Sequence, residues 1–136
     1  MADRLQLELV TPERAVLSDP VDEVVLPSVD GYMGVLPGHA PLLAQLDAGE
    51  VSYRVGGDRH YLAISGGYAE ILRDSVSVLA RTAERAEEID VDRAKKAKDR
   101  AASALKTDLP PDDFSKAEVH LKRAISRIRV HGRRTG

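Results

Sequence analysis

The sequence predicts an α+β chain with an all-β first half and an all-α second half. Hydrophobic residues recur with a period of two in the first half, as in half-buried strands, and at helical spacing in the second. Glycine follows the same division, since eight of the ten glycines precede Tyr68 and none lies between Tyr68 and His131. We place the boundary after residue 86, which gives domains at 1–86 and 87–136.

Short alternating segments and turn residues succeed each other about every ten positions in the first half. Leucine alternates with polar residues at 5–9. Further strands are expected at 21–26, 51–55, 60–65, 68–72 and 76–79. Gly56 and Gly57 predict a hairpin turn, because glycine accepts positive φ, whereas Gly66 and Gly67 interrupt the pattern. This spacing predicts a small β-sandwich or barrel.

Two helices are expected in the second half, separated by Pro110 and Pro111, which must break a helix. The first has Asp90 as its N-cap and an alanine face made of Ala94, Ala97, Ala101 and Ala104. The second has Asp112 or Asp113 as its cap and an apolar face made of Phe114, Ala117, Leu121, Ala124 and Ile128. The prediction is an antiparallel helical hairpin. An alanine seam buries little area, so the closed hairpin should be marginal; the alternative is a rigid cap on the sandwich.

Composition and motifs exclude several classes of chemistry. The chain has no cysteine, which rules out disulfides and cysteine-ligated zinc. It lacks a phosphate-loop motif, and its four histidines lack metal-ligand spacing. No apolar run approaches the ~20 residues that span a bilayer. We therefore expect neither an enzyme nor a membrane-inserted protein.

The net charge of −2 conceals a strong asymmetry. Residues 1–80 carry 12 acidic and five basic side chains, whereas residues 114–136 carry one acidic and seven basic side chains. A basic tail on an acidic body indicates an anionic contact, which could be nucleic acid, lipid or an acidic protein surface.

Three segments carry a resemblance to a known family. Residues 31–43 (GYMGVLPGHAPLL), 64–71 (ISGGYAEI) and 89–94 (IDVDRA) occur in this order across the two halves. They resemble markers of the epsilon subunits of bacterial F-type ATP synthases. The resemblance implies a ten-stranded β-sandwich with a C-terminal helical hairpin, placed against the gamma subunit and the ring of c subunits.

The segment 31–43 is implied to lie towards the c-ring. Its candidate contact residues are Tyr32, Met33, Val35, Leu36 and His39. Glycine and proline shape such a loop, and apolar side chains would supply its surface. The alternative is an internal connection with Leu42 and Leu43 in the core and with His39 as a turn residue.

The resemblance also implies ATP as a regulatory ligand on the hairpin, bound without hydrolysis; no cofactor is required. The matching positions are Glu84, Ile89, Asp90, Arg93, Ala94, Arg100, Arg123 and Arg127. Guanidinium groups pair with phosphate oxygens, and arginines four or seven apart share a helix face. The alternative is that Asp90 only caps the helix and pairs with Arg93, with the other arginines solvated.

The expected function is that of a non-catalytic central-stalk subunit that couples proton flow to ATP synthesis. The hairpin would inhibit ATP hydrolysis when extended, with Lys116, Lys122 and Arg129, beside Arg123 and Arg127, contacting the beta subunits. The expected location is the cytoplasmic face of the bacterial cell membrane, as a peripheral part of the complex, with no nucleic-acid partner. Alternatives are a structural adaptor with a fixed hairpin and a nucleic-acid-binding module, which the acidic sandwich and the scarcity of aromatics disfavour.

Overall fold

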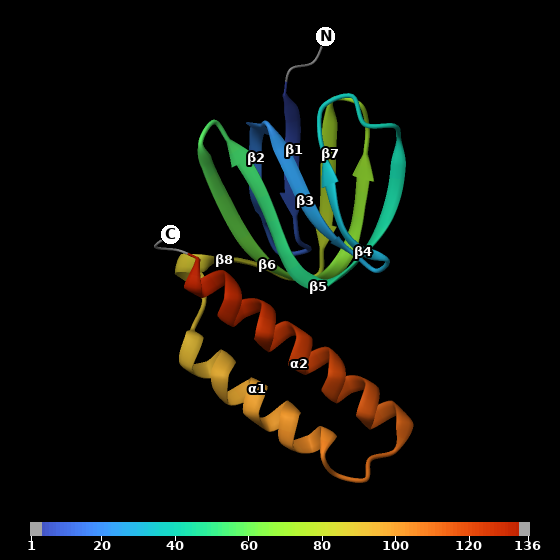
Figure 1. Ribbon diagram of the computed structural model, residues 1–136, viewed down its shortest axis with the longest axis vertical. Helices are drawn as coiled ribbons and strands as arrows, with labels where there is room; N and C mark the ends of the chain where they lie inside the picture. Colours follow the sequence, from blue (N-terminus) through green and yellow to red (C-terminus); the bar gives the residue numbers. More distant parts are fainter. Residues whose placement is uncertain (1–3, 134–136) are drawn as a thin grey trace.

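The computed structural model describes residues 4–133 as a folded β-sheet followed by a helical hairpin (Figure 1). The strands are β1 (Leu5–Val10), β2 (Ala15–Val21), β3 (Glu23–Ser28), β4 (Gly31–Val35), β5 (Leu42–Val55), β6 (Asp58–Ile71), β7 (Ser75–Ala80) and β8 (Ala83–Arg85). A short 3₁₀ helix, η1 (Ala86–Glu88), leads to α1 (Val91–Leu105) and α2 (Pro111–Gly132). The predicted class, a β half followed by two helices, is confirmed.

The strands form one sheet in the order β2-β1-β7-β6-β5-β3-β4, with β8 paired to β6. The sheet folds over itself and encloses an aliphatic core. Leu5, Leu7 and Leu9 are completely buried while their neighbours on β1 are exposed, as the period of two predicts. The core therefore lies between the two layers.

Two strands of 14 residues, β5 and β6, pair along almost their whole length and bend together at the end of the sandwich next to the helices (Figure 1). The pairing skips Asp47 and Gly66, which lie at the bend. Each bent strand contributes to both layers. The described residues accordingly form eight strands rather than the expected ten, because the chain passes from layer to layer without breaking.

Several expected strand limits were wrong for related reasons. Gly66 and Gly67 do not interrupt a strand; both take positive φ within β6. The expected strand at 21–26 is divided, since Val21 ends β2 and β3 begins at Glu23. Part of the expected loop 31–43 is strand β4, paired with β3. The turn at Gly56 and Gly57 is confirmed by the pairing of the residues on either side of it.

The two helices follow the prediction except at one end. The Asp90 side chain accepts a hydrogen bond of 3.1 Å from the backbone N–H of Arg93, so the N-cap of α1 is confirmed. At α2, neither Asp112 nor Asp113 is the cap: Pro111 occupies the first helical position, and Pro110 precedes it. Proline suits this position because its missing N–H would have no helical partner there.

The helices are stacked in order below the sandwich, with α2 between the sheet and α1 (Figure 1). Ala94 and Ala101 of α1 and Ala117 and Ala124 of α2 are buried, which confirms the alanine seam. Neither helix described at 91–132 is long and apolar enough to cross a membrane.

Candidate functional site

Helix α2 is fastened to the sandwich by ion pairs along its length. Lys122 Nζ lies 3.0 Å from Asp47 Oδ2, and Arg133 Nε, just beyond the helix, lies 3.0 Å from Glu50 Oε2. The Arg133 guanidinium also stands 4.6 Å from the centre of the Tyr61 ring, a distance typical of a cation–π contact. The acidic partner that the basic tail meets in this state is therefore the protein's own sandwich.

A small apolar contact completes the attachment. Val130 of α2 is completely buried against Ala63 of β6, Ala86 of η1 and Ile89. Ile89, one of the expected ligand residues, thus belongs to the core that joins helix and sheet. It does not line the cleft described next.

A cleft of about 380 Å³ opens where the sandwich edge meets both helices. It is lined by Glu84 of β8, Glu88 of η1, Asp90 at the helix cap, Arg93, Ala94, Ala97 and Arg100 of α1, and Arg127 of α2. Six of the eight residues expected from the sequence therefore come together. Glu88 and Ala97 were missed, although Ala97 lies one turn beyond Ala94 on the same helix face.

Each carboxylate of the cleft already has a partner. Glu88 pairs with Arg14, from the turn between β1 and β2, at 2.9 Å and accepts a 2.9 Å hydrogen bond from the backbone N–H of Arg85. The Arg14 guanidinium, followed by that N–H, lowers the pKa of the Glu88 carboxyl, and the carboxylate raises the pKa of Arg14. Asp90 caps α1. These bonds fix the floor of the cleft.

The guanidinium groups of the cleft differ in their pairing. Arg127 Nε donates a 2.5 Å hydrogen bond to Glu84 Oε1 across the seam between α2 and β8. Arg93 and Arg100 are exposed, and within residues 4–133 neither side chain has an ion pair or hydrogen bond. The expected ion pair between Asp90 and Arg93 is thus not found, although the capping bond is.

Arg123 lies beside the cleft rather than in it. Together with Glu84 and Arg127 it lines a separate cavity of about 10 Å³, bounded by β6 and β8, and its buried Nε has no partner there. The alignment of Arg123 and Arg127 on one helix face was correct. The helix, however, turns Arg123 towards the sheet.

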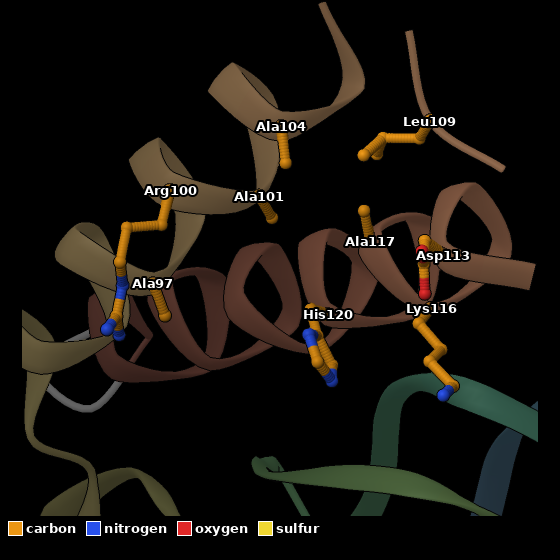
Figure 2. A pocket seen from close by; sticks show the side chains of 9 residues that line it. All are labelled: Ala97, Arg100, Ala101, Ala104, Leu109, Asp113, Lys116, Ala117 and His120. Atoms are coloured by element: carbon orange, nitrogen blue, oxygen red, sulfur yellow. The ribbon is translucent and has the colours of Figure 1, made fainter. Parts of the chain in front are cut away.

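A larger apolar groove of about 550 Å³ continues from the cleft along the hairpin. Ala101 and Ala104 of α1 point towards Ala117 of α2, and Leu109 reaches over them from the connecting segment (Figure 2). Arg100, Asp113, Lys116 and His120 stand at its rim. The helices are therefore joined by methyl groups with open space beside them, which agrees with the predicted thin packing.

The residues expected to contact the c-ring do not form one surface. Tyr32 and Leu36 are 59% and 54% exposed, but they stand at opposite ends of β4, which separates them by about 13 Å at 3.3 Å per residue. Met33 packs partly against the core. Val35 is completely buried; assigning it to a partner contact was wrong, because its side chain faces inward from the strand.

The alternatives for the same segment divide. Leu42 and Leu43 are 44% and 70% exposed, so the expectation that they enter the core was wrong. His39 Nδ1 donates to the Ala40 carbonyl oxygen at 2.6 Å, as in the alternative that made it a turn residue. Among the basic residues of α2, Lys116 and Arg129 are exposed, whereas Lys122 is the one paired with Asp47.

An exposed apolar patch on the sandwich was missed. Val10, Leu79 and Tyr68 stand side by side on β1, β7 and β6 through the register of the sheet, and they are 36%, 57% and 55% exposed. Pro12 and Arg81 help to line a hollow of about 310 Å³ beside them. The outward alternation of these residues was visible in the sequence, but the order of the strands was not.

Two family models match almost the whole chain. The model of the ATP synthase delta/epsilon chain β-sandwich domain matches residues 4–86, and that of the delta/epsilon chain long α-helix domain matches residues 87–132. A solved chain in the mitochondrial ATP synthase of Euglena gracilis, from an OSCP/F1/c-ring structure, superposes with a TM-score of 0.83. That match has 26% identity and covers 93% of this chain and 80% of the other.

Curated relatives agree at higher identity. An ATP synthase epsilon chain of Nitratidesulfovibrio vulgaris (strain DP4) is 47% identical over 132 residues, covering 97% of this chain and 98% of the relative. One from Syntrophobacter fumaroxidans is 48% identical over 130 residues, covering 96% and 97%. The chain therefore belongs to the family of ATP synthase epsilon chains.

Proposed function

We propose that the chain is a non-catalytic subunit of the F-type ATP synthase central stalk whose docked hairpin binds ATP as a regulatory ligand. The observation that carries the proposal is the origin of the cleft residues. Glu84 belongs to the sandwich, Arg93 and Arg100 to α1, and Arg127 to α2. A ligand that touches all of them requires a closed hairpin, so binding and closure are one event.

The chemistry of the cleft suits a nucleotide triphosphate. Its volume lies within the ~300–1,000 Å³ typical of small-molecule sites. Arg93 and Arg100 offer uncommitted guanidinium groups two helical turns apart, which can pair with successive phosphates. Ala94 leaves space between them. ATP at a hundredfold excess over its dissociation constant would stabilise the closed form by ~2.7 kcal/mol.

Release of the hairpin would give the second half of the regulation. The α2 arginine and lysine that now pair with the sandwich would become free, adding to the exposed Lys116 and Arg129. A basic helix of this kind can bind acidic segments of the beta subunits and so inhibit ATP hydrolysis. The hairpin thus has two anionic partners, its own sandwich and the catalytic subunits.

The sandwich would supply the fixed contacts with the gamma subunit and the c-ring. The patch of Val10, Tyr68 and Leu79 and the exposed Tyr32 and Leu36 offer apolar surface of the kind that interfaces bury. The relatives named as ATP synthase epsilon chains support this assignment. It places the chain peripherally on the cytoplasmic face of the membrane, where it couples proton flow to ATP synthesis.

Calorimetric titration with ATP tests the site. Arg93→Ala should weaken binding about tenfold or more, the worth of one hydrogen bond to a charged group. Asp90→Ala should also weaken it, and Asp90→Ser separates the reasons, because serine keeps the helix cap but removes the carboxylate. Asp92→Ala, in the first turn but outside the cleft, is the control. Unchanged affinity for Arg93→Ala would remove the site.

Truncation after Pro110 tests the inhibitory role in the assembled complex. Loss of α2 should raise ATPase activity, because no basic helix remains to reach the catalytic subunits. A flat activity would refute inhibition while leaving ATP binding untouched.

A fixed structural adaptor is the second candidate, and the ion pairs that fasten α2 favour it. Distances between a label on the sandwich and one on α2, measured in the complex with and without ATP, separate the two. A regulator changes this distance, and an adaptor does not.

A further inference from the structure

The bond between Arg127 and Glu84 occupies the same guanidinium that the proposed ligand needs. Arg127 is the cleft's only arginine on α2 and, of the three, the only one already paired among the described residues. Both side chains are partly buried, at 37% and 28% exposure. The Nε–Oε1 distance of 2.5 Å places a carboxylate oxygen where a phosphate oxygen would bind.

We infer that Glu84 is an internal competitor of the nucleotide, holding Arg127 in the empty cleft and giving it up to the ligand's phosphate. This inference rests on the proposed function, and it changes the role of Glu84 from ligand to regulator. The other two carboxylates cannot compete in this way. Glu88 is held by Arg14 and by the Arg85 N–H, and Asp90 is held by the start of α1.

The exchange has a second consequence, because Glu84 lies on the sandwich and Arg127 on α2. Without nucleotide, the pair helps to keep α2 against β8. With nucleotide, the phosphate bridges Arg127 to Arg93 and Arg100 of α1. ATP therefore replaces a bond from helix to sheet by a bond from helix to helix, while Lys122, Val130 and Arg133 keep α2 on the sandwich.

The experiment compares ATP affinity of the full chain and of the Glu84→Gln variant by calorimetry, at low salt. Removing the competitor should tighten binding about two- to fivefold, the range expected for a partly exposed ion pair. Weaker or unchanged binding overturns the inference. Glu87→Gln is the matched control: it removes the same charge from neighbouring η1, but Glu87 lies outside the cleft, so its affinity should equal that of the parent chain.

A double-mutant cycle identifies the partner. In the Arg127→Gln background, Glu84→Gln should have no further effect on ATP affinity, because the guanidinium for which it competes is gone. An equal gain in both backgrounds would indicate a general charge effect and overturn the exchange. A label distance between sandwich and α2 is recorded for each variant, so that affinities are compared at a known closed fraction.

The two proposals fail differently. If the parent chain binds no ATP, the proposed function falls. If it binds ATP and Glu84→Gln does not tighten binding, only the competitor role falls.

Discussion

Lys122 on α2 and Asp47 at the bend of β5 are 75 residues apart in sequence and 3.0 Å apart in space. The Lys122 ammonium is the main cause that lowers the pKa of the Asp47 carboxyl. A lowered carboxyl pKa means that the pair stabilises the docked helix above the ordinary value of ~3.9 and loses this effect as pH falls through the lowered value.

Acid should therefore loosen α2 at its middle. We expect the label distance between sandwich and α2 to grow below about pH 4. Lys122→Gln should shift this transition to higher pH, because the pKa of Asp47 returns towards its ordinary value. The side chains are 59% and 42% exposed, so the loss of stability at neutral pH should stay within ~0.5 kcal/mol. A transition unaffected by Lys122→Gln would contradict the assignment.

Val130 should contribute more to docking than any ion pair. Val130→Ala removes two buried carbons from the contact with Ala63, Ala86 and Ile89 and should cost about 2 kcal/mol. Amide hydrogen exchange in α2 would report the loss as faster exchange. Val119→Ala, at a position 42% exposed on the same helix, should leave exchange nearly unchanged, and equal effects would speak against the apolar contact.

The alanine seam makes opposite predictions for two substitutions. Ala104 borders the open groove (Figure 2), so Ala104→Leu should fill it and stabilise the hairpin by about 1 kcal/mol. Ala124 is 1% exposed, so Ala124→Leu should force the helices apart and destabilise by ~1–3 kcal/mol. Denaturant titration followed by helical circular dichroism measures both. The same sign for both variants would mean that the groove is not open space.

Gly67 is required by its place in β6. Its φ is +144°, and a Cβ there would stand 2.0 Å from the Leu79 carbonyl oxygen. Gly67→Ala should destabilise the sandwich by ~3 kcal/mol or more, through strain and a backbone clash. Gly34→Ala meets nothing within 4 Å and serves as the control in thermal unfolding. Comparable midpoints for the two variants would contradict this account.

Much of the fold could be predicted because local patterns determine it. Alternation along β1, the cap at Asp90 and the alanine spacing of α1 each depend on residues within one or two turns. The number of strands could not be predicted in the same way. Gly66 and Gly67 are turn formers in sequence, yet in the sheet they allow β6 to bend without ending.

The cleft shows the same limit at the level of charges. Helical spacing placed Arg93 and Arg100 on one face, and the resemblance added the partners on other elements. Which arginine is free and which is paired depends on long-range contacts, such as the one between Arg127 and Glu84, 43 residues apart. The inward turn of Val35 likewise depends on its pairing with Val24, which no local pattern specifies.

The stacking order of the two helices has a mechanical consequence. Because α1 packs chiefly on α2, and α2 on the sheet, the outer helix has no resting place of its own once the inner one departs. Both must detach together, which makes the hairpin an all-or-none switch rather than a pair of independently fraying segments.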